Sequence, residues 1–349
     1  MVIYVFAELW GVVMLNLMFW QLANKICRTR EAKKFYMMFG LIGNLGMIVA
    51  GELMMYFSNI AKHNQDISNN PVVVQIITAA LFMALILTGL YRYVYTKIIP
   101  DPRYYLPAAE IEHYQKPNFT QSIKTIMTSK YLGLILALII CYGISINLIE
   151  GVWKAKVREL YPTIHEYMWF MGMMGKWIGI GTIASYIVGH NVLRMFGWLF
   201  TARITPVMML VTGMGFFIFC LFQKHLLVFQ GWIGYAPLTV AVFLGLLQNV
   251  LAKSTKYSLF DGVKEIAYIP LDDELKTKGK AVVDVLGSSI GKSSGSIILS
   301  SLFMIIPGAT FNDLMPVVMV VFILILLSWL HSIKSLHKAY EALKAKSER

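Results

Sequence analysis

Long apolar segments constrain what this chain can fold into more than any other feature of its sequence. A helix needs about 20 mostly apolar residues to cross a bilayer. Nine segments meet this requirement, and they cover approximately residues 2–22, 36–58, 71–94, 131–152, 166–189, 204–222, 232–252, 281–305 and 315–333. Because 57% of the 349 residues are hydrophobic and only 14% are charged, a soluble domain is excluded. The sequence predicts an all-α polytopic membrane protein with nine transmembrane helices.

Basic residues outnumber acidic ones by 31 to 19, but they are spread between the apolar segments and form no single basic patch. This pattern is typical of membrane topology, so we predict no nucleic-acid partner. The three cysteines and seven histidines are scattered, without the short spacings of a disulfide framework or a metal site. The sequence therefore predicts no metal, no cofactor and none of the clustered catalytic groups of an enzyme.

Lysine and arginine are enriched in the cytoplasmic loops of membrane proteins. The loops after the first, third, fifth and seventh segments, with the C-terminal tail, hold 23 of these residues, whereas the opposite loops hold 5. The first segment is therefore expected to begin outside and end inside. The predicted parts are the remainder of an N-terminal half-bundle, a cytoplasmic linker, a C-terminal six-helix half-bundle and a basic cytoplasmic tail, at residues 1–94, 95–130, 131–333 and 334–349. This division and the orientation lead us to expect a bundle whose first three helices are missing.

Ionisable side chains inside apolar segments are energetically expensive, so each one is a candidate functional residue. For Arg92, which lies at the end of its segment, snorkelling to the interface is the better explanation. Glu52 and Lys176 lie among glycines, so helix packing competes with a transport role for both. For Glu8, the alternative to a transport role is a carboxylate at the outer surface. The complete set of candidates is Glu8, Glu52, Arg92, Glu150, Lys176 and Lys292.

Glu150 belongs to a polar stripe on an otherwise aliphatic helix. Gly143, Asn147 and Glu150 recur at positions i, i+4 and i+7, so they share a face that should line a cavity. Trp153 and Lys154 are expected to mark the outer interface of the membrane, which makes a surface position the alternative for Glu150.

Lys292 is placed beside glycines that repeat every four residues, at positions 287, 291 and 295, where a helix or a ligand can approach closely. The run "GSSIGKS" lacks one residue of the P-loop spacing, so an ATPase site is rejected. Cations and carboxylates in one cavity predict a carrier of an anionic or zwitterionic solute. Ion pairs would hold the empty site together until substrate phosphates displace the carboxylates.

Residues 251–295, "LAKSTKYSLFDGVKEIAYIPLDDELKTKGKAVVDVLGSSIGKSSG", closely resemble the signature region of the bacterial and plastid ATP/ADP translocase family. Further matches are "AELWG" and "FWQLANKI" in the first segment, "EAKKFYMMFGLIGNLG" after it, and "YGISINLIEGVWK" in the fourth segment. The resemblance covers nearly the whole chain.

This resemblance implies a major-facilitator-like bundle of twelve helices, of which the nine segments would be the fourth to the twelfth. It implies an alternating-access antiporter of ATP and ADP in a lipid membrane, most simply the bacterial cell (inner) membrane. The transport-critical charges of the family match Glu8, Glu150 and Lys292, and Lys176 is a possible helper. A further lysine of the family, in its early helices, has no counterpart here.

Several alternatives remain open. One is a proton-coupled importer, or a carrier of other nucleotides such as NAD, from the same family. A second is an incomplete translocase that inserts into the membrane without transporting. The loop from Phe260 to Lys280 is either a solvated connection or an electrostatic funnel in which Lys264, Lys276 and Lys278 recruit nucleotide.

Overall fold

The computed structural model is all-helical, as predicted, and no strand occurs in the residues that it describes. Those residues are 18–19, 22–23, 29–63, 71–101, 129–229, 231, 234–271, 275 and 279–347. Glu8 and almost all of the predicted segment 2–22 lie outside them. The other eight predicted segments fall within described helices over all or most of their length.

Two compact units make up the chain, one of residues Met1–Leu45 and Ile60–Gln115 and the other of Gly46–Asn59 and Lys116–Arg349. In the first unit, helix α4 (Pro71–Tyr93) continues into the π-helix η2 (Val94–Ile98). Large apolar side chains of α4 are exposed along its length. Such a surface suits contact with lipid chains better than contact with water. The long helix α3 (Thr29–His63) contributes its middle, Gly46–Asn59, to the second unit.

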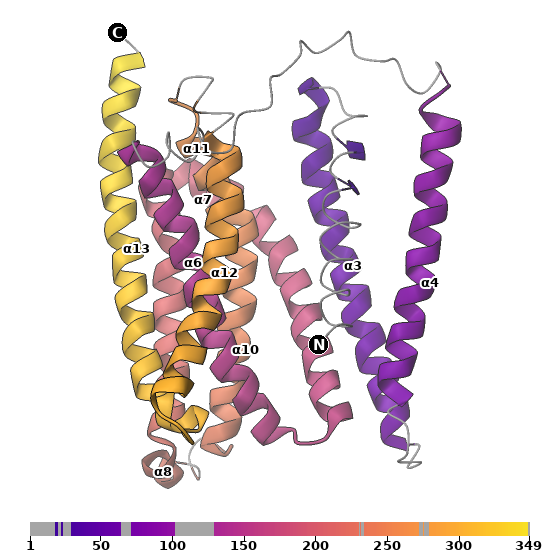
Figure 1. The fold of residues 1–349 in the computed structure, drawn as a ribbon, viewed down its shortest axis with the longest axis vertical. Helices are drawn as coiled ribbons and strands as arrows, with labels where there is room; N and C mark the ends of the chain where they lie inside the picture. The colour runs from indigo at the N-terminus through magenta and orange to yellow at the C-terminus, as the bar shows by residue number, and fades with distance from the viewer. Residues whose placement is uncertain are drawn as a thin grey trace. The chain divides into compact units, whose positions relative to one another are not determined.

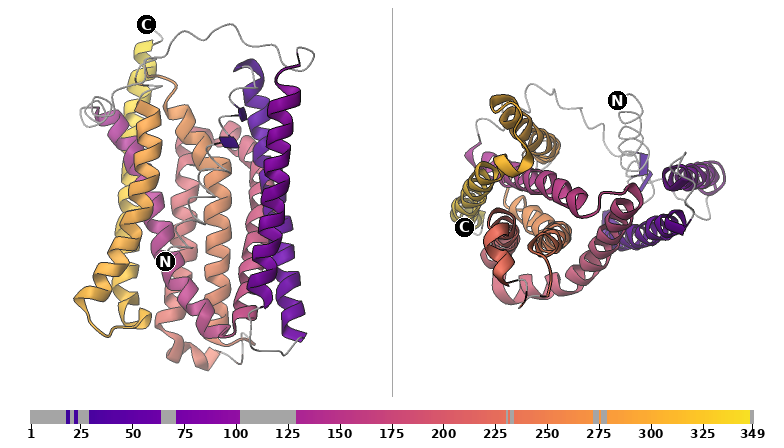
Figure 2. Two further views of the ribbon diagram at one scale, coloured as in Figure 1. Left: turned by 45° about the vertical axis from the view of Figure 1, so that its right-hand side comes forward. Right: turned by 90° about the horizontal axis from the view of Figure 1, so that it is seen from below.

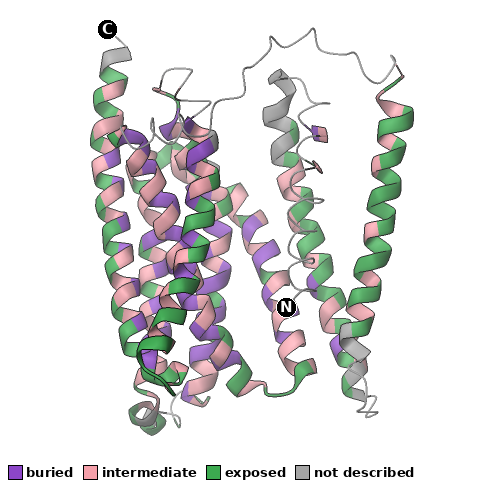
Figure 3. Cartoon of the chain, viewed as in Figure 1, coloured by how far each residue is buried: buried purple, intermediate pink, exposed green. Residues whose placement is uncertain are grey.

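The second unit is a bundle of long helices (Figures 1 and 2). Helix α6 packs against α10, α12 and α13, and α10 also packs extensively against α7. The colouring by burial in Figure 3 shows buried residues concentrated within this unit. Its elements are α6 (Lys130–Leu160), α7 (Ile164–Leu221), α8 (Gln223–Leu226), η3 (Leu227–Phe229), α10 (Pro237–Thr255), η4 (Lys256–Phe260), α11 (Asp261–Ala267), α12 (Lys280–Ile305) and α13 (Phe311–Ser347).

A glycine divides α7 into two arms. At 58 residues α7 is too long for one membrane crossing, and Gly197 interrupts it with φ 74° and ψ −179°. This backbone conformation is open almost only to glycine. The chain reverses there, because α8, which follows the second arm, lies at the end of the bundle where the first arm begins (Figure 1). The predicted segments 166–189 and 204–222 are therefore the two arms, joined without a loop.

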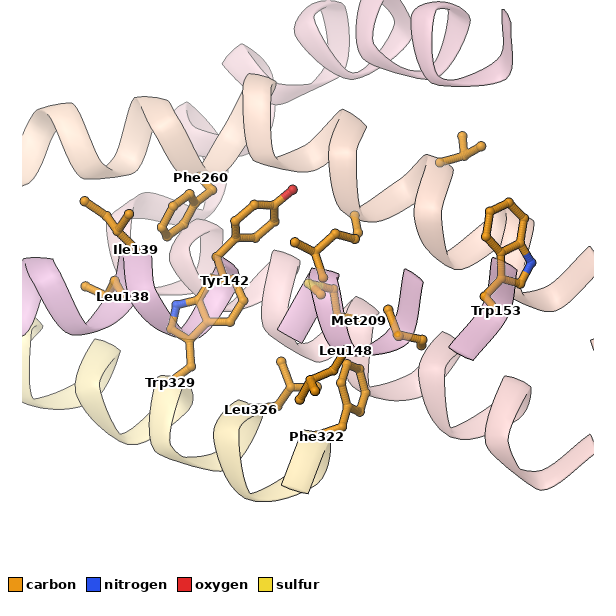
Figure 4. Close-up of a cluster of buried hydrophobic side chains, with 14 of the residues drawn as sticks. Leu138, Ile139, Tyr142, Leu148, Trp153, Met209, Phe260, Phe322, Leu326 and Trp329 are labelled. Atoms are coloured by element: carbon orange, nitrogen blue, oxygen red, sulfur yellow. The ribbon is translucent and has the colours of Figure 1, made fainter. Parts of the chain in front are cut away.

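Aromatic side chains form the centre of the core of the second unit. The ring of Tyr142 on α6 stacks on Phe260 at 5.9 Å and meets Trp329 of α13 edge-on at 6.0 Å (Figure 4). Trp153 is completely buried, and its indole N–H donates to the carbonyl oxygen of Val242 at 2.8 Å. Trp153 therefore packs inside the protein, and its position at the outer interface of the membrane stays a prediction.

Helices extend well beyond several of the predicted segment ends. The segment predicted at 131–152 is part of a helix that ends at Leu160. The segment predicted at 232–252 becomes one apolar helical stretch from Pro237 to Ala267 through α10, η4 and α11. This stretch includes Lys253, Lys256 and Lys264, for which the sequence predicts a cytoplasmic loop. This part of the predicted loop is thus helical, and its cytoplasmic position stays a prediction.

Six described helical stretches are long and apolar enough to cross a membrane, so the chain is a multi-pass membrane protein in agreement with the prediction. They cover Met38–Ile60, Val74–Ile98, Lys130–Leu160, Asn191–Leu221, Pro237–Ala267 and Phe311–Ala345. Helix α12 and the first arm of α7 are also long, but they fall short of this test. The predicted total of nine spans is thus not confirmed.

Small residues bring α6 and α12 into backbone contact. A Cβ atom added to Gly143 would lie 2.7 Å from Cα of Gly291, and one added to Gly295 would lie 2.6 Å from Cβ of Asn147. The glycine repeat of α12 therefore packs against a helix, which is one of the two roles that the sequence left open for it.

This contact makes Gly143 sensitive to the smallest enlargement. We expect Gly143→Ala to destabilise the protein by about 1–3 kcal/mol, because backbone must move to admit the methyl group. Gly133→Ala on the same helix is the matched control, since its Cβ would meet nothing within 4 Å. Thermal unfolding in detergent measures both, and equal stability of the two variants would contradict the expectation.

Candidate functional site

Glu150 on α6 lies between two lysines. Its carboxylate oxygens are 3.0 Å from Nζ of Lys253 on α10 and 2.8 Å from Nζ of Lys154, one turn along α6. The side chains of Glu150 and Lys253 are 21% and 23% exposed, so they border the surface of the unit without projecting fully from it. The polar stripe predicted the position of Glu150, but it did not reveal Lys253 as the partner.

The ion pair of Glu150 and Lys253 lies far from the ends of its helices. Lys253 is sixteen residues after Pro237 and fourteen before Ala267, which places it about 20 Å from either end of that stretch at the rise of an α-helix. Glu150 is likewise twenty residues after Lys130 and ten before Leu160. Charges in the interior of membrane-spanning helices are rare and usually functional. Whether Glu150 lines a cavity or lies at the outer surface stays a prediction.

A second ion pair follows on the next turn, where the helix is π-helical. Nζ of Lys256 lies 3.1 Å from a carboxylate oxygen of Asp261, 4.3 Å from the ring centre of Tyr257 and 5.8 Å from that of Tyr142. The π-helix η4 spans Lys256–Phe260. Short π-helical segments within long helices are frequent at functional sites.

Two more ion pairs join α11 to α12. Nζ of Lys264 is 2.9 Å from Asp284, and Nζ of Lys280 is 2.5 Å from Glu265. Only 13% of the Lys264 side chain is exposed, so this lysine is engaged within the fold instead of facing solvent as a recruiting cation. Lys276 and Lys278, the other residues of the predicted funnel, lie outside the described residues.

Lys292 stands in the middle of α12, twelve residues after Lys280 and thirteen before Ile305. Its side chain is exposed, and in the described part of the chain no carboxylate forms an ion pair with it. The glycine face of α12 is turned to α6, while the exposed residues beside Lys292 are mostly hydroxyl-bearing. They are Ser288, Ser289, Ser293, Ser296 and Ser300. Lipid chains cannot solvate serine hydroxyls and a lysine ammonium group, so we expect this face of α12 to border water.

Glu52 and Lys176, both predicted candidates, form an ion pair with each other within the second unit. Their helices touch through glycines, because a Cβ atom on Gly51 would lie 2.5 Å from the carbonyl oxygen of Gly172. The packing alternative thus applies to both residues, and the ion pair accompanies it. Arg92 is exposed in the last turn of α4, as snorkelling requires.

Lys253 and Lys256 are cations held by carboxylates that a polyanion can replace, whereas no contact among the described residues joins Lys292 to either of them. Lys253 and Lys256 each have one carboxylate partner, and Lys292 is open to a ligand. No group of three or more His, Cys, Asp or Glu side chains among the described residues could hold a metal ion. The arrangement therefore suits reversible binding of a multiply charged anion and contains no assembled metal centre in the part of the chain that is described.

Sequence reasoning missed Lys253 and Lys256 as site residues. Asn249, Lys253 and Lys256 recur at positions i, i+4 and i+7, so they share one helix face, and this spacing could have indicated an extended helix. Gln248 and Asn249 are fully buried in α10, so the helix is already enclosed by protein where the charges begin.

Comparison with known proteins gives consistent matches. The family described as TLC ATP/ADP transporter matches residues 1–340. "ADP,ATP carrier protein 1" of Rickettsia prowazekii (strain Madrid E) is 44% identical over 99% of this chain and 70% of its own length. "ADP,ATP carrier protein 3" of the same strain is 42% identical over 97% of this chain and 69% of its own length. "ADP,ATP carrier protein 1" of Rickettsia typhi is 44% identical over 99% and 70%. No solved structure matches the chain.

Proposed function

Because this chain belongs to the TLC ATP/ADP transporter family, we propose that it exchanges ATP for ADP across a membrane by alternating access. The observation that carries this proposal beyond the family match is the combination of an ion-paired Lys253 and an open Lys292, both near the middle of long helical stretches. The phosphates of a nucleotide present several acceptor oxygens to such lysines. No covalent chemistry is needed for exchange.

In the empty site, Glu150 would take the place of a nucleotide phosphate as the negative partner of Lys253. It holds Lys253 while no phosphate is present, and an arriving phosphate takes over this lysine. When the nucleotide leaves, Glu150 recovers Lys253, which lowers the free energy of the empty site and assists release. The roles of Glu8, which matches a charge of the family, and of the helper Lys176 stay proposals, with Lys176 acting through its ion pair with Glu52.

The open cation at Lys292 also explains why exchange should be obligatory. An unpaired lysine that is closed off from water in the occluded state carries a desolvation penalty of several kcal/mol. A bound nucleotide supplies the missing negative charge, so the loaded carrier can reorient and the empty one is held back. Exchange of one nucleotide for another follows from this difference.

We further propose nine spans in a major-facilitator-like arrangement. Lys292 and Lys176 lie on α12 and on the first arm of α7, whose polar residues weaken the apolar signal of a span. Polar residues are expected on helices that line a cavity. The division into half-bundle, linker, half-bundle and tail, the three missing helices and the bacterial cell membrane as location stay predictions.

Transport into vesicles tests the function. The purified protein is reconstituted into liposomes that contain ADP or only buffer, and uptake of labelled ATP is measured. We expect uptake only into ADP-loaded liposomes, unchanged by a protonophore. Uptake into empty liposomes that stops when the proton gradient collapses would support the proton-coupled alternative. Absence of uptake by correctly inserted protein would support an incomplete translocase.

A further inference from the structure

Tyr257 is an exposed aromatic residue in the middle of the charged helix. It lies in η4, one turn beyond Lys253, and 42% of the residue is exposed. The neighbouring aromatic residues Tyr142 and Phe260 are buried in the core. Ion-paired residues, Lys253 before it and Asp261 after it, flank this exposed tyrosine along the chain. Its exposure between charged groups makes it a candidate ligand contact.

Contacts of the same helix show which way Tyr257 is directed. Lys253 reaches α6 through Glu150, and the hydroxyl of Ser254 donates to the carbonyl oxygen of Ile178 on the first arm of α7 at 3.5 Å. Residues four apart lie on one helix face, so Tyr257 follows Lys253 and stands between the side that contacts α6 and the side that contacts α7. Tyr257 and Lys253 therefore lie on the same side of the helix, about one turn apart.

One face of the Tyr257 ring is occupied and fixed. Nζ of Lys256 lies 4.3 Å from the ring centre, a cation–π contact, and Asp261 holds that ammonium group at 3.1 Å. The contact with Lys256 fixes the position of the ring before any ligand arrives, and the 42% exposure of the residue leaves part of the ring accessible to a flat partner.

We propose that the exposed part of the Tyr257 ring is the platform on which the base of the transported nucleotide stacks, while Lys253 takes a phosphate one helical turn away. This inference rests on the proposed function and adds to it the position of the base. Stacking on an aromatic ring accepts every base and favours the larger purines. Tyr257 is then a residue that sets affinity for nucleotides over simple polyphosphates.

Binding of ATP and of inorganic tripolyphosphate to the purified protein separates the two parts of the ligand. In the native protein ATP should bind more tightly than tripolyphosphate. Tyr257→Leu should weaken ATP binding about tenfold and leave tripolyphosphate binding unchanged, because stacking contributes roughly this factor per base. Tyr257→Phe keeps the ring and should stay within about threefold of the native affinity for ATP, since the stacking surface is preserved. Tyr235→Leu, at an exposed tyrosine just before α10, is the matched control and should change neither ligand.

Other results overturn the inference. Native affinity for ATP in Tyr257→Leu would exclude stacking on this ring. An equal loss of ATP and tripolyphosphate binding would show that the leucine disturbs the phosphate site or the fold, and Tyr257→Phe with the same loss as Tyr257→Leu would show that the hydroxyl matters instead of the ring. If the native protein binds tripolyphosphate as well as ATP, no base platform exists. Failure of the native protein to bind either ligand would instead refute the proposed function.

Discussion

Replacement of Lys292 by alanine should reduce exchange of ATP for ADP by about 100-fold, because one charge-assisted hydrogen bond contributes as much as about 3 kcal/mol. The other lysine of α12, Lys280, lies about three turns away and pairs with Glu265. The amount of protein in the membrane should not change. The Lys292 side chain is exposed and has no ion-pair partner among the described carboxylates, so its removal leaves no other charge unsatisfied. Lys292→Arg keeps the positive charge and should retain most of the exchange.

The matched control is Lys338→Ala, which removes an exposed lysine near the end of α13. Initial rates of ATP uptake into ADP-loaded liposomes, divided by the amount of inserted protein, give the comparison. A rate for Lys292→Ala close to that of the native protein would contradict a phosphate-binding role. An equal loss in Lys338→Ala would attribute both effects to the net charge of the protein.

The existence of the helices could be predicted because the bilayer requires it. A segment that crosses a membrane must satisfy its backbone hydrogen bonds internally, so a long apolar run allows almost no other conformation. The eight predicted segments that the structure describes are accordingly helical over all or most of their length. The resemblance to the ATP/ADP translocase family was likewise confirmed, since it rests on residues spread over nearly the whole chain.

The ends of the helices could not be predicted from apolar content alone. The predicted segment 232–252 stops where lysines begin, yet the helix continues to Ala267. Lys253 is neutralised by Glu150, which lies 103 residues earlier in the chain, and Lys264 by Asp284 on another helix. A count of local charges treats each lysine as a cost, whereas the fold pairs them with distant carboxylates.

The burial of Trp153 could not be predicted for a similar reason. Tryptophan at the end of an apolar run is usual at a membrane interface. Here its ring fits against Gly245, where an added Cβ atom would lie 2.0 Å from Cδ1 of the indole. The space for Trp153 is therefore made by a glycine on α10, and nothing in the sequence near Trp153 indicates it.

Only the part of the candidate site that lies on a single helix could be predicted. The stripe through Gly143, Asn147 and Glu150 is a local pattern on one helix, so it could be read from the sequence. The ion pair of Glu52 with Lys176 joins residues of different helices. Each had been considered alone, and only the fold makes them partners.

Opposite effects on nucleotide binding are expected when Glu150 and Lys253, the two partners of one ion pair, are neutralised separately. Glu150→Gln leaves Lys253 and Lys154 without their carboxylate, so ADP should bind about tenfold more tightly, since one charge-assisted contact no longer has a competitor. Lys253→Gln removes a phosphate ligand, and ADP should bind about tenfold more weakly for the same energetic reason. Exchange should fall at least about tenfold in both variants, because Glu150→Gln retains nucleotide too long and Lys253→Gln captures it poorly.

Tighter ADP binding in Glu150→Gln together with weaker ADP binding in Lys253→Gln distinguishes a competing carboxylate from a merely structural ion pair. If the pair only held α6 to α10, both variants would lose stability and nucleotide affinity together. Glu159→Gln provides the control for a structural ion pair, because Glu159 pairs with the buried Lys156 near the end of the same helix at 2.7 Å. This variant should lose stability, whereas ADP binding and exchange per folded protein should stay unchanged. Weaker ADP binding in Glu150→Gln would therefore contradict the proposed release mechanism. Tighter binding together with slower exchange would mean that the carboxylate has to displace the phosphate from Lys253 before the carrier can release its substrate.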